Sequence, residues 1–297
     1  MKQIGFALLF AAASVFAGEL RVSSDQTVGG FKFPESVAYD AKEKVLYVGN
    51  FGGEKPAPAE KDGLGYISKV ALSGKVIEGK VFPAPGGEAM NKPKGIWIRG
   101  DRLWVTDIDA VWIFDLRTKK QRRLKIPEAK FLNDPAVMGR TLYLSDNRND
   151  MLYRVEPADF LDAKVKPKVF GAATNAEINP NGLYPGRGGI LLMVGLAPEP
   201  EAKRGIYALG VSGQLKVIAE PFGRLDGLYE MKDGSLLFTD WSTGSLSHWS
   251  ESGGVKQLAS GFKGPADFCV VPAADGSMTV VVPDLPQSQL RFIHLRN

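Results

Sequence analysis

The sequence has one cysteine and two histidines among 297 residues, and this scarcity restricts its chemistry. A single cysteine, Cys269, allows no internal disulfide, and its place in the apolar run F-C-V-V predicts a small buried side chain rather than a reactive thiol. The histidines, His248 and His294, are too few for a histidine-based metal cage, and both fall in segments expected to be outer strands. Zinc and copper, which favour histidine and cysteine ligands, are therefore disfavoured.

Several familiar cofactor and nucleophile motifs are also missing. The chain contains no G-x-x-x-x-G-K-[ST] loop, so a phosphate-cradling nucleotide site has no support. It contains no G-x-S-x-G turn, which argues against a serine nucleophile of the hydrolase type. We expect no nucleotide, flavin or haem.

Only the N-terminus has a long apolar run. The segment M-K-Q-I-G-F-A-L-L-F-A-A-A-S-V-F-A has a basic start, a short apolar stretch and small residues near its end. It predicts a secretory signal over residues 1–17, cleaved after Ala17, and a secreted or periplasmic mature domain over residues 18–297. The alternative is a retained membrane anchor, but spanning a bilayer takes about 20 apolar residues and this stretch is shorter. We expect no membrane contact after cleavage.

The net charge is low, with a formal value of +4, and acidic and basic residues are interspersed along the chain. The one dense basic run, K-K-Q-R-R over residues 119–123, follows the turn-forming segment D-L-R-T. No aromatic residues alternate with these charges, as they would on a surface that stacks nucleic-acid bases. The run therefore predicts a solvated hairpin tip, and no nucleic-acid partner is expected.

Short β-rich segments make up nearly all of the chain after residue 33. They contain Val, Ile, Leu, Tyr and Trp, and turns of Gly, Pro, Asp and Asn separate them. The exception is residues 156–164, E-P-A-D-F-L-D-A-K, where one or two helical turns are expected. Six of the segments open on a polar or small motif, as in L-N-D-P-A-V, N-P-N-G-L-Y and R-L-D-G-L-Y.

The spacing of these openings predicts the architecture. The opening residues are Glu35, Lys94, Asn133, Asn181, Asp226 and Asp267. Their spacings are 59, 39, 48, 45 and 41 residues, and four of the five match a four-stranded propeller blade. The sequence thus predicts an all-β, six-bladed β-propeller. The last blade has only three strands, and residues 19–28 form a strand without a hairpin partner, so we expect this N-terminal strand to close the ring. A β-sandwich, the alternative, would leave the spacing unexplained.

In an antiparallel blade, the first strand starts on the face where the second strand ends. The six opening residues should therefore meet at one mouth, together with the strand-two ends Asn50, Asp107, Asp146 and Asp240. Crowded carboxylates and amides favour a hard divalent cation, with Ca²⁺ preferred and Mg²⁺ or Mn²⁺ as alternatives. Such residues also form turns and tie backbone amides together, a role favoured for the strand-two acids.

Lys94 either neutralises a carboxylate or holds an anionic substrate. Loops 51–65 and 196–205 are expected on the same face, as binding elements or tolerated insertions.

At this point the motifs resemble a known family. Glu35 in blade one, N-D at 133–134, N-G-L at 181–183 and D-G-L at 226–228 are similar to the senescence-marker-protein (regucalcin)/gluconolactonase family of paraoxonase-like propellers. The resemblance implies that Glu35, Asn181 and Asp226 bind the metal. It also implies that Asn133 contacts substrate or metal, and that Asp226 is the general base. The family's E-G-P is P-E-S here, Asn179 rivals Asn181, and no counterpart exists for the histidine pair of paraoxonases.

The resulting hypothesis is an exported, metal-dependent hydrolase that acts on a lactone, a related ester or a sugar-acid-like ligand. Asp226 and Asn133 are the catalytic candidates. Further candidates at the same mouth are Lys94, Asp134, Asp146, Asp240 and Asp267. The alternative is a non-catalytic exported propeller of the N-H-L type, which binds a small ligand or a protein partner without turnover.

Overall fold

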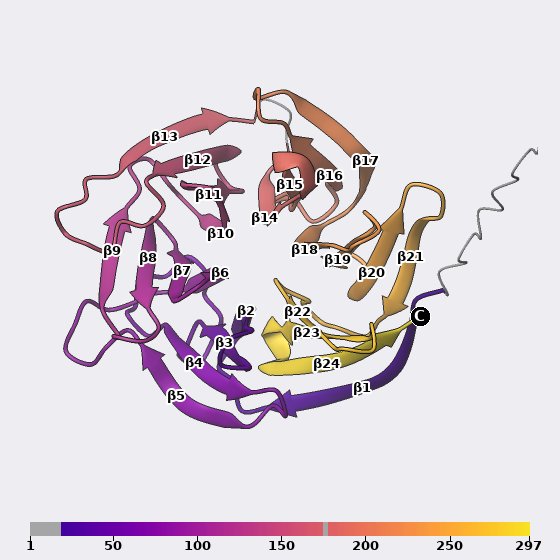
Figure 1. The fold of residues 1–297 in the computed structure, drawn as a ribbon, viewed down its shortest axis with the longest axis horizontal. Helices are drawn as coiled ribbons and strands as arrows, with labels where there is room; N and C mark the ends of the chain where they lie inside the picture. Colours follow the sequence, from indigo (N-terminus) through magenta and orange to yellow (C-terminus); the bar gives the residue numbers. More distant parts are fainter. Residues whose placement is uncertain (1–18, 175–177) are drawn as a thin grey trace, which may run out of the picture.

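Six four-stranded antiparallel sheets are arranged as blades around a common axis in the computed structural model, which describes residues 19–174 and 178–297 (Figure 1). The predicted signal segment, residues 1–17, lies outside the described residues. Within those residues, no helix is both long and apolar enough to cross a membrane. The predicted all-β, six-bladed architecture is confirmed.

The blades follow one another along the chain, and in blades one to five the first strand is innermost. Blade one contains β2 (Pro34–Asp40), β3 (Val45–Asn50), β4 (Tyr66–Ala71) and β5 (Val76–Phe82). Blade two contains β6 (Pro93–Arg99), β7 (Arg102–Asp107), β8 (Ala110–Asp115) and β9 (Gln121–Lys125). Blade three contains β10 (Leu132–Met138), β11 (Thr141–Asp146), β12 (Met151–Glu156) and β13 (Lys168–Ala173). Blade four contains β14 (Pro180–Pro185), β15 (Leu191–Gly195), β16 (Arg204–Leu209) and β17 (Leu215–Gly223). Blade five contains β18 (Leu225–Glu230), β19 (Leu236–Asp240), β20 (Ser245–Ser250) and β21 (Gly254–Ala259). Blade six contains β22 (Cys269–Pro272), β23 (Met278–Asp284), β24 (Gln289–Arg296) and β1 (Arg21–Gly29). Two short 3₁₀ turns are η1 (Arg187–Gly189) and η2 (Leu285–Gln287).

The N-terminal strand closes the ring, as predicted. β1 pairs antiparallel with β24, from Arg21 opposite Arg296 to Gly29 opposite Gln289, and Figure 1 shows it along the outer side of β24. Asp25 forms an ion pair with Arg291 across this junction. Because β1 supplies the fourth strand of blade six, it covers the edge that β24 would otherwise expose.

Apolar residues are buried between adjacent blades. Tyr47 and Phe82 of blade one pack with Trp112 and Phe114 of blade two in one such cluster. Every residue of β8 is buried, since this strand has a neighbouring sheet on each face. This double burial explains why the strands read as nearly continuous apolar runs rather than as strict alternation.

The helical turns predicted for residues 156–164 do not form, so that prediction is wrong. The segment has only bends and a turn after β12. Ala158 and Phe160 are buried in the core, and the Arg122 guanidinium donates hydrogen bonds to the carbonyls of Phe160, Asp162 and Val165. Core packing and capture of these carbonyls by Arg122 hold the segment in an irregular conformation.

A register break near the start of each of the first strands of blades one to five aims neighbouring residues at the axis. The pairing of β2 with β3 shifts between Pro34 and Ser36, and blades two to five repeat the shift at the same place. A bulge of this kind re-aims side chains next to functional sites. In each blade, one residue directly follows the first residue of the innermost strand that pairs with the second strand. These six residues are called the upper ring, and they are Glu35, Lys94, Asn133, Asn181, Asp226 and Ala266.

The predicted register of Asp267 is therefore wrong by one residue. Pro265 pairs with Asp284 just as Leu225 pairs with Asp240, so Ala266 is the equivalent of Asp226. Asp267 belongs to the middle ring, which contains Ser36, Gly95, Asp134, Gly182, Gly227 and Asp267. Glycine is required in this ring where first strands approach closely, since a Cβ on Gly182 would lie 1.9 Å from the Asp226 carbonyl oxygen.

Candidate functional site

The upper ring opens into a cavity of about 490 Å³, here called the upper cavity. Its volume falls within the roughly 300–1,000 Å³ of small-molecule sites. The structure brings together five of the predicted residues in its lining, namely Glu35, Lys94, Asn133, Asn181 and Asp226. Both long loops contribute as well, through Pro56 and Pro58 of loop 51–65 and Leu196 and Pro198 of loop 196–205.

Five side-chain oxygen atoms in the lining of this cavity are buried without a hydrogen-bond donor among the described residues. They are Glu35 Oε2, Asn133 Oδ1, Asn147 Oδ1, Asn181 Oδ1 and Asp226 Oδ1. The other atoms of two of these groups are engaged, because Trp241 Nε1 donates to Asp226 Oδ2 at 2.8 Å and Asn181 Nδ2 donates to Leu225 O at 3.2 Å. Buried acceptors of this kind are costly unless a donor or a cation satisfies them.

This set of oxygens fits a hard divalent cation. Within residues 19–174 and 178–297, no group of three or more carboxylate, histidine or cysteine side chains is arranged to hold a metal ion. A cation here would therefore be bound by two carboxylates and by amide oxygens, a mixed oxygen set of the type that Ca²⁺ accepts. Glu35, Asn133, Asn181 and Asp226 are the residues that would hold it, and Asn147 supplies a further unpaired amide oxygen in the same lining.

Burial makes the acids of this region hard to ionise. It raises the pKa of Asp226 to about 7, against which the Trp241 hydrogen bond acts. The pKa of Glu35 is raised well above its usual value, first by burial and then by the nearby Asp226 carboxylate, while Lys94 opposes the shift. Both acids thus favour the neutral form, and a bound cation would favour the charged form.

Lys94 faces the same cavity and forms no ion pair within the described part of the chain. Its side chain is fully buried, with Nζ 4.1 Å from the centroid of the Phe131 ring. Among the described residues, Nζ forms one hydrogen bond, a long one of 3.5 Å to Lys92 O. Burial lowers the pKa of Lys94 to about 8, with Glu35 opposing the shift. Lys94 thus acts on the Glu35 carboxyl group by charge without pairing with it, and both predicted roles stay predictions.

Several residues of the cavity lining were not predicted, although they occupy a repeated position in the sequence. In five blades the residue directly after the end of the second strand lines the cavity: Phe51, Asn147, Leu196, Trp241 and Leu285. Arg148, one residue further along in blade three, lies over the Phe131 ring at 3.8 Å from its centroid. The repeat that identified the opening residues therefore also identifies a second layer of cavity residues, one position after the strand-two end in every blade except blade two.

Loop 51–65 is fastened over the cavity by buried charge. Lys92 is fully buried, and its Nζ binds Asp62 Oδ2 at 2.5 Å and Phe51 O at 3.2 Å. Lys61, at the same end of the loop, pairs with Asp109 at 2.6 Å. The insertion is thus a fixed wall of the cavity rather than a tolerated surface loop.

The strand-two acids serve as backbone clamps, not as cavity residues. Asp146 accepts hydrogen bonds from the amides of Lys130 and Phe131 at 2.7 and 3.0 Å, and Asp107 accepts those of Asn91 and Lys92. Asp240 similarly accepts the amide of Arg224 at 3.0 Å. None of these three acids lines the upper cavity. Asp146 and Asp240 therefore have the structural role that was the favoured alternative.

Replacing Asp146 with alanine should destabilise the protein by about 2–4 kcal/mol, because two buried amides lose their acceptor. Urea unfolding of the variant would measure the change. Asp146→Asn is the control, since it keeps one acceptor oxygen and should lose about half as much. A loss below about 0.5 kcal/mol for the alanine variant would contradict the clamp.

Asp134 and Asp267 lie below the upper ring and line a different cavity. Asp134 Oδ2 accepts the amide of Leu183 at 2.7 Å, and Asp267 Oδ2 accepts the Ser36 hydroxyl at 2.7 Å. Both were predicted at the mouth with Asp226. Both instead belong to the middle ring and line the cavity on the other side of the upper ring from the upper cavity.

Other predicted features have clear positions. Asn179 is not in the cavity lining, because its Oδ1 accepts hydrogen bonds from Arg204, at 2.9 Å from Nε. His248 and His294 lie on third strands, β20 and β24, away from the upper cavity. Cys269 lies on the innermost strand and is half-buried rather than buried as predicted. Its surroundings raise the pKa of the thiol, first through burial and then through Asp267.

Only the first two residues of the basic run, Lys119 and Lys120, lie at the exposed turn between β8 and β9, whereas residues 121–123 belong to β9. The predicted solvated hairpin tip is therefore confirmed for the two lysines only. Two of its charges are used inside the protein. Arg122 binds the carbonyls after β12, and Arg123 pairs with Asp109 at 3.4 Å. The expectation that it binds no nucleic acid stays a prediction.

Comparison with known proteins shows the fold and no family. No protein-family model matches the sequence, and no curated protein matches it either. Among solved structures, a virginiamycin B lyase from Staphylococcus aureus superposes with a TM-score of 0.62 at 13% identity, covering 94% of this chain and 100% of that chain. A streptogramin B lyase gives 0.59 at 13% identity, with 92% and 97% covered. The β-propeller domain of Cps50 (Swd1) from Myceliophteria thermophila gives 0.57 at 12% identity, with 91% and 99% covered. The resemblance to the regucalcin/gluconolactonase family stays a prediction, whereas the chain is a six-bladed propeller similar in fold to virginiamycin B lyase and related propellers.

Proposed function

We propose that the upper cavity hydrolyses an ester or lactone with the help of one divalent cation of the Ca²⁺ type. The observation that carries this proposal is the set of five buried oxygens without donors, two from carboxylates and three from amides. When bound, such a cation would polarise the carbonyl of the substrate and stabilise the developing negative charge. The similarity in fold to two lyases adds only that propellers of this shape include enzymes.

Asp226 is the group best placed to move the proton. Its Oδ2 is held by Trp241, which fixes the direction of Oδ1 in the cavity. In the ionised carboxylate, Oδ1 would accept a proton from the water that attacks the substrate carbonyl. A carboxylate oxygen has two lone pairs, so this role is compatible with a cation contact at the same atom. Asn133 would contact the substrate or the cation through its unpaired Oδ1.

The rest of the cavity indicates which esters fit. Besides the carboxyl groups of Glu35 and Asp226, the cavity lining contains three basic side chains, Lys94, Arg148 and Arg224. When the acyl C–O bond of the tetrahedral intermediate breaks, Asp226 would return the proton taken from water to the leaving alcohol oxygen. The acid product then loses its proton to solvent, and the Lys94 ammonium would stabilise the resulting carboxylate. The wall between these groups is largely apolar. Its members are Phe51, Pro56, Pro58, Phe131, Leu196, Pro198, Trp241, Leu285 and Pro286. An ester or lactone with an apolar body suits this wall better than a sugar lactone.

The proposal is tested by assaying a phenyl ester, an alkyl lactone and δ-gluconolactone with chelator and then with added Ca²⁺. We expect turnover in Ca²⁺, fastest for the two apolar substrates, and its loss in chelator. Saturating Ca²⁺ should also raise the melting temperature by roughly 5–10 °C, since ligand at 100 times Kd adds about 2.7 kcal/mol.

The two measurements separate the candidate functions. Thermal stabilisation without turnover of any substrate would favour the non-catalytic binding propeller. If Ca²⁺, Mg²⁺ and Mn²⁺ give neither stabilisation nor turnover, the cavity has no metal site and the protein is a scaffold. Turnover that chelator does not change would remove the cation from the mechanism.

A further inference from the structure

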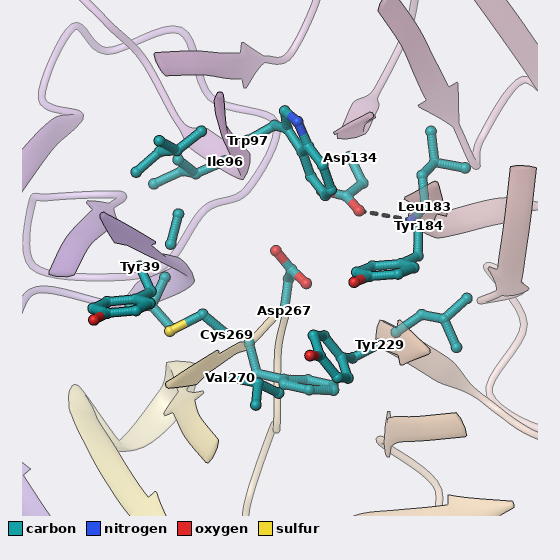
Figure 2. Close-up of a pocket in the computed structure, with 15 residues that line it drawn as sticks. Tyr39, Ile96, Trp97, Asp134, Leu183, Tyr184, Tyr229, Asp267, Cys269 and Val270 are labelled. Atoms are coloured by element: carbon teal, nitrogen blue, oxygen red, sulfur yellow. Dashed lines mark hydrogen bonds between the residues drawn. The ribbon is translucent and has the colours of Figure 1, made fainter. Parts of the chain in front are cut away.

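A second cavity, of about 190 Å³, lies on the other side of the middle ring and is called the lower cavity. Figure 2 shows its lining, in which the Asp267 carboxylate projects toward the centre and Asp134 lies close to Leu183. The cavity is smaller than the roughly 300–1,000 Å³ of drug-sized sites, so it suits a compact ligand. It shares no residue with the lining of the upper cavity.

Three aromatic side chains form a continuous wall of this cavity. Trp97 and Tyr184 meet edge to face with ring centroids 6.0 Å apart, and Tyr184 and Tyr229 do so at 5.2 Å. They come from blades two, four and five, and they meet because blade three has only Ala136 at the same register position. The small alanine lets the rings of blades two and four come into contact.

The two carboxyl groups of this cavity have no basic partner among the described residues. Asp134 and Asp267 are 4% and 8% exposed, and neither forms an ion pair within the described residues. Each uses Oδ2 to accept one internal hydrogen bond, Asp267 from the Ser36 hydroxyl and Asp134 from the Leu183 amide. A carboxylate that is nine-tenths buried and aimed into a cavity requires a positive partner or a donor.

The chemistry of the wall selects the kind of cation. A metal ion such as Ca²⁺ favours several converging oxygen ligands, as the upper cavity offers, whereas the lower cavity offers two carboxyl groups beside aromatic rings. An alkylated ammonium ion, in contrast, is stabilised by the faces of Trp and Tyr rings and by a nearby carboxylate. A neutral apolar ligand would fill the space but leave the Asp267 carboxylate unpaired.

We propose that the lower cavity binds a small organic ammonium ion, with Asp267 as its counter-ion and Trp97, Tyr184 and Tyr229 as its aromatic wall. This site is independent of the proposed hydrolysis, because none of its residues belongs to the upper cavity. The protein thus has two ligand sites, one at each end of the axis, and their polar residues are adjacent in sequence at Asn133 and Asp134.

Calorimetric titration of the full chain with tetramethylammonium chloride tests the proposal, with uncharged tert-butanol as the matched probe. We expect tetramethylammonium to bind about tenfold or more tightly than tert-butanol. Asp267→Asn should remove this preference, since the amide keeps the hydrogen bond to Ser36 and loses only the charge. Tyr229→Leu should weaken tetramethylammonium binding about fivefold by removing one ring of the wall.

Trp241→Leu is the control variant, because it removes an aromatic ring from the upper cavity and should leave the titration unchanged. If Asp267→Asn does not fold, the contrast between Tyr229→Leu and Trp241→Leu decides. Equal affinity for the two probes, no binding of tetramethylammonium, or a loss of binding in Trp241→Leu rather than Tyr229→Leu would overturn the proposal.

Discussion

Asp226→Asn should remain folded and lose ester hydrolysis by about 10²–10⁴-fold, the usual contribution of a general base. The amide preserves the size of the side chain and an acceptor for Trp241 Nε1, which donates to Asp226 Oδ2 at 2.8 Å. It cannot take a proton from water, and it weakens the negative charge that would hold a cation. Steady-state kinetics on the best ester substrate in Ca²⁺ would measure the loss.

Asp115→Asn is a matched control for this variant. Asp115 is another buried carboxylate, 7% exposed, but it accepts the amides of Arg117 and Thr118 at a turn and lies outside the upper cavity. We expect its hydrolysis to stay within about twofold of the parent protein, with some loss of stability from its hydrogen bonds. Hydrolysis by Asp226→Asn at the parent rate would show that the base has been assigned wrongly.

Asp226→Asn also separates the two proposed roles of Asp226, general base and cation ligand. If the residue acts only as a base, Ca²⁺ will raise the melting temperature of Asp226→Asn as it does for the parent protein. If it also binds the cation, that rise will shrink. Glu35→Gln serves as the comparison, since Glu35 has only the ligand role and should lose cation affinity in proportion to its activity.

In chelator, the protein should become less stable as the pH rises from about 4 to 8. The pKa of Asp226 is raised to about 7 by burial, and so is that of Asp267, where burial comes first and the Ser36 hydrogen bond opposes it. Unfolding returns such groups to values near 4. Between these values the folded state binds more protons than the unfolded state, so their stabilisation is full below the unfolded pKa and is lost as pH rises through 7.

Thermal unfolding at pH 5 and pH 8 would measure this effect. We expect a fall of several degrees in chelator, because each kcal/mol shifts the melting temperature of a domain near this size by roughly 2–4 °C. Saturating Ca²⁺ should abolish most of the fall, since a bound cation favours ionised Glu35 and Asp226. Asp226→Asn should also flatten the profile in chelator. A melting temperature that rises with pH in chelator would contradict the burial of these acids.

The blades were predictable because the signal is repeated. Six segments of similar length each carry an apolar run, a turn and a polar opening, and such redundancy outweighs ambiguity in any one segment. Strand β1 was predictable for a related reason, since residues 19–28 had no local partner and blade six lacked a strand. Residues 156–164 carried one local pattern, and the contacts of Phe160 and Arg122 overrode it.

The site was only partly predictable, because a bulge changes which residues face the axis. Strict alternation would send adjacent residues to opposite faces, yet Asn133 and Asp134 both face the axis, one in each cavity. The position of Asp267 depends on this detail, since a spacing of 41 residues instead of 40 leaves the repeat unchanged. Only its pairing partners show that Ala266 is the residue equivalent to Asp226.

The sequence by itself determined the six blades, their closure by the N-terminal strand, and the meeting of Glu35, Asn133, Asn181 and Asp226 at one mouth. These follow from local patterns that recur along the chain. The tertiary structure decided what depends on neighbours distant in sequence. It showed which acids clamp backbone amides, it placed Lys94 against Phe131 rather than in an ion pair, and it gathered Trp97, Tyr184 and Tyr229 around Asp267. Those outcomes depend on packing between blades, which no single blade encodes.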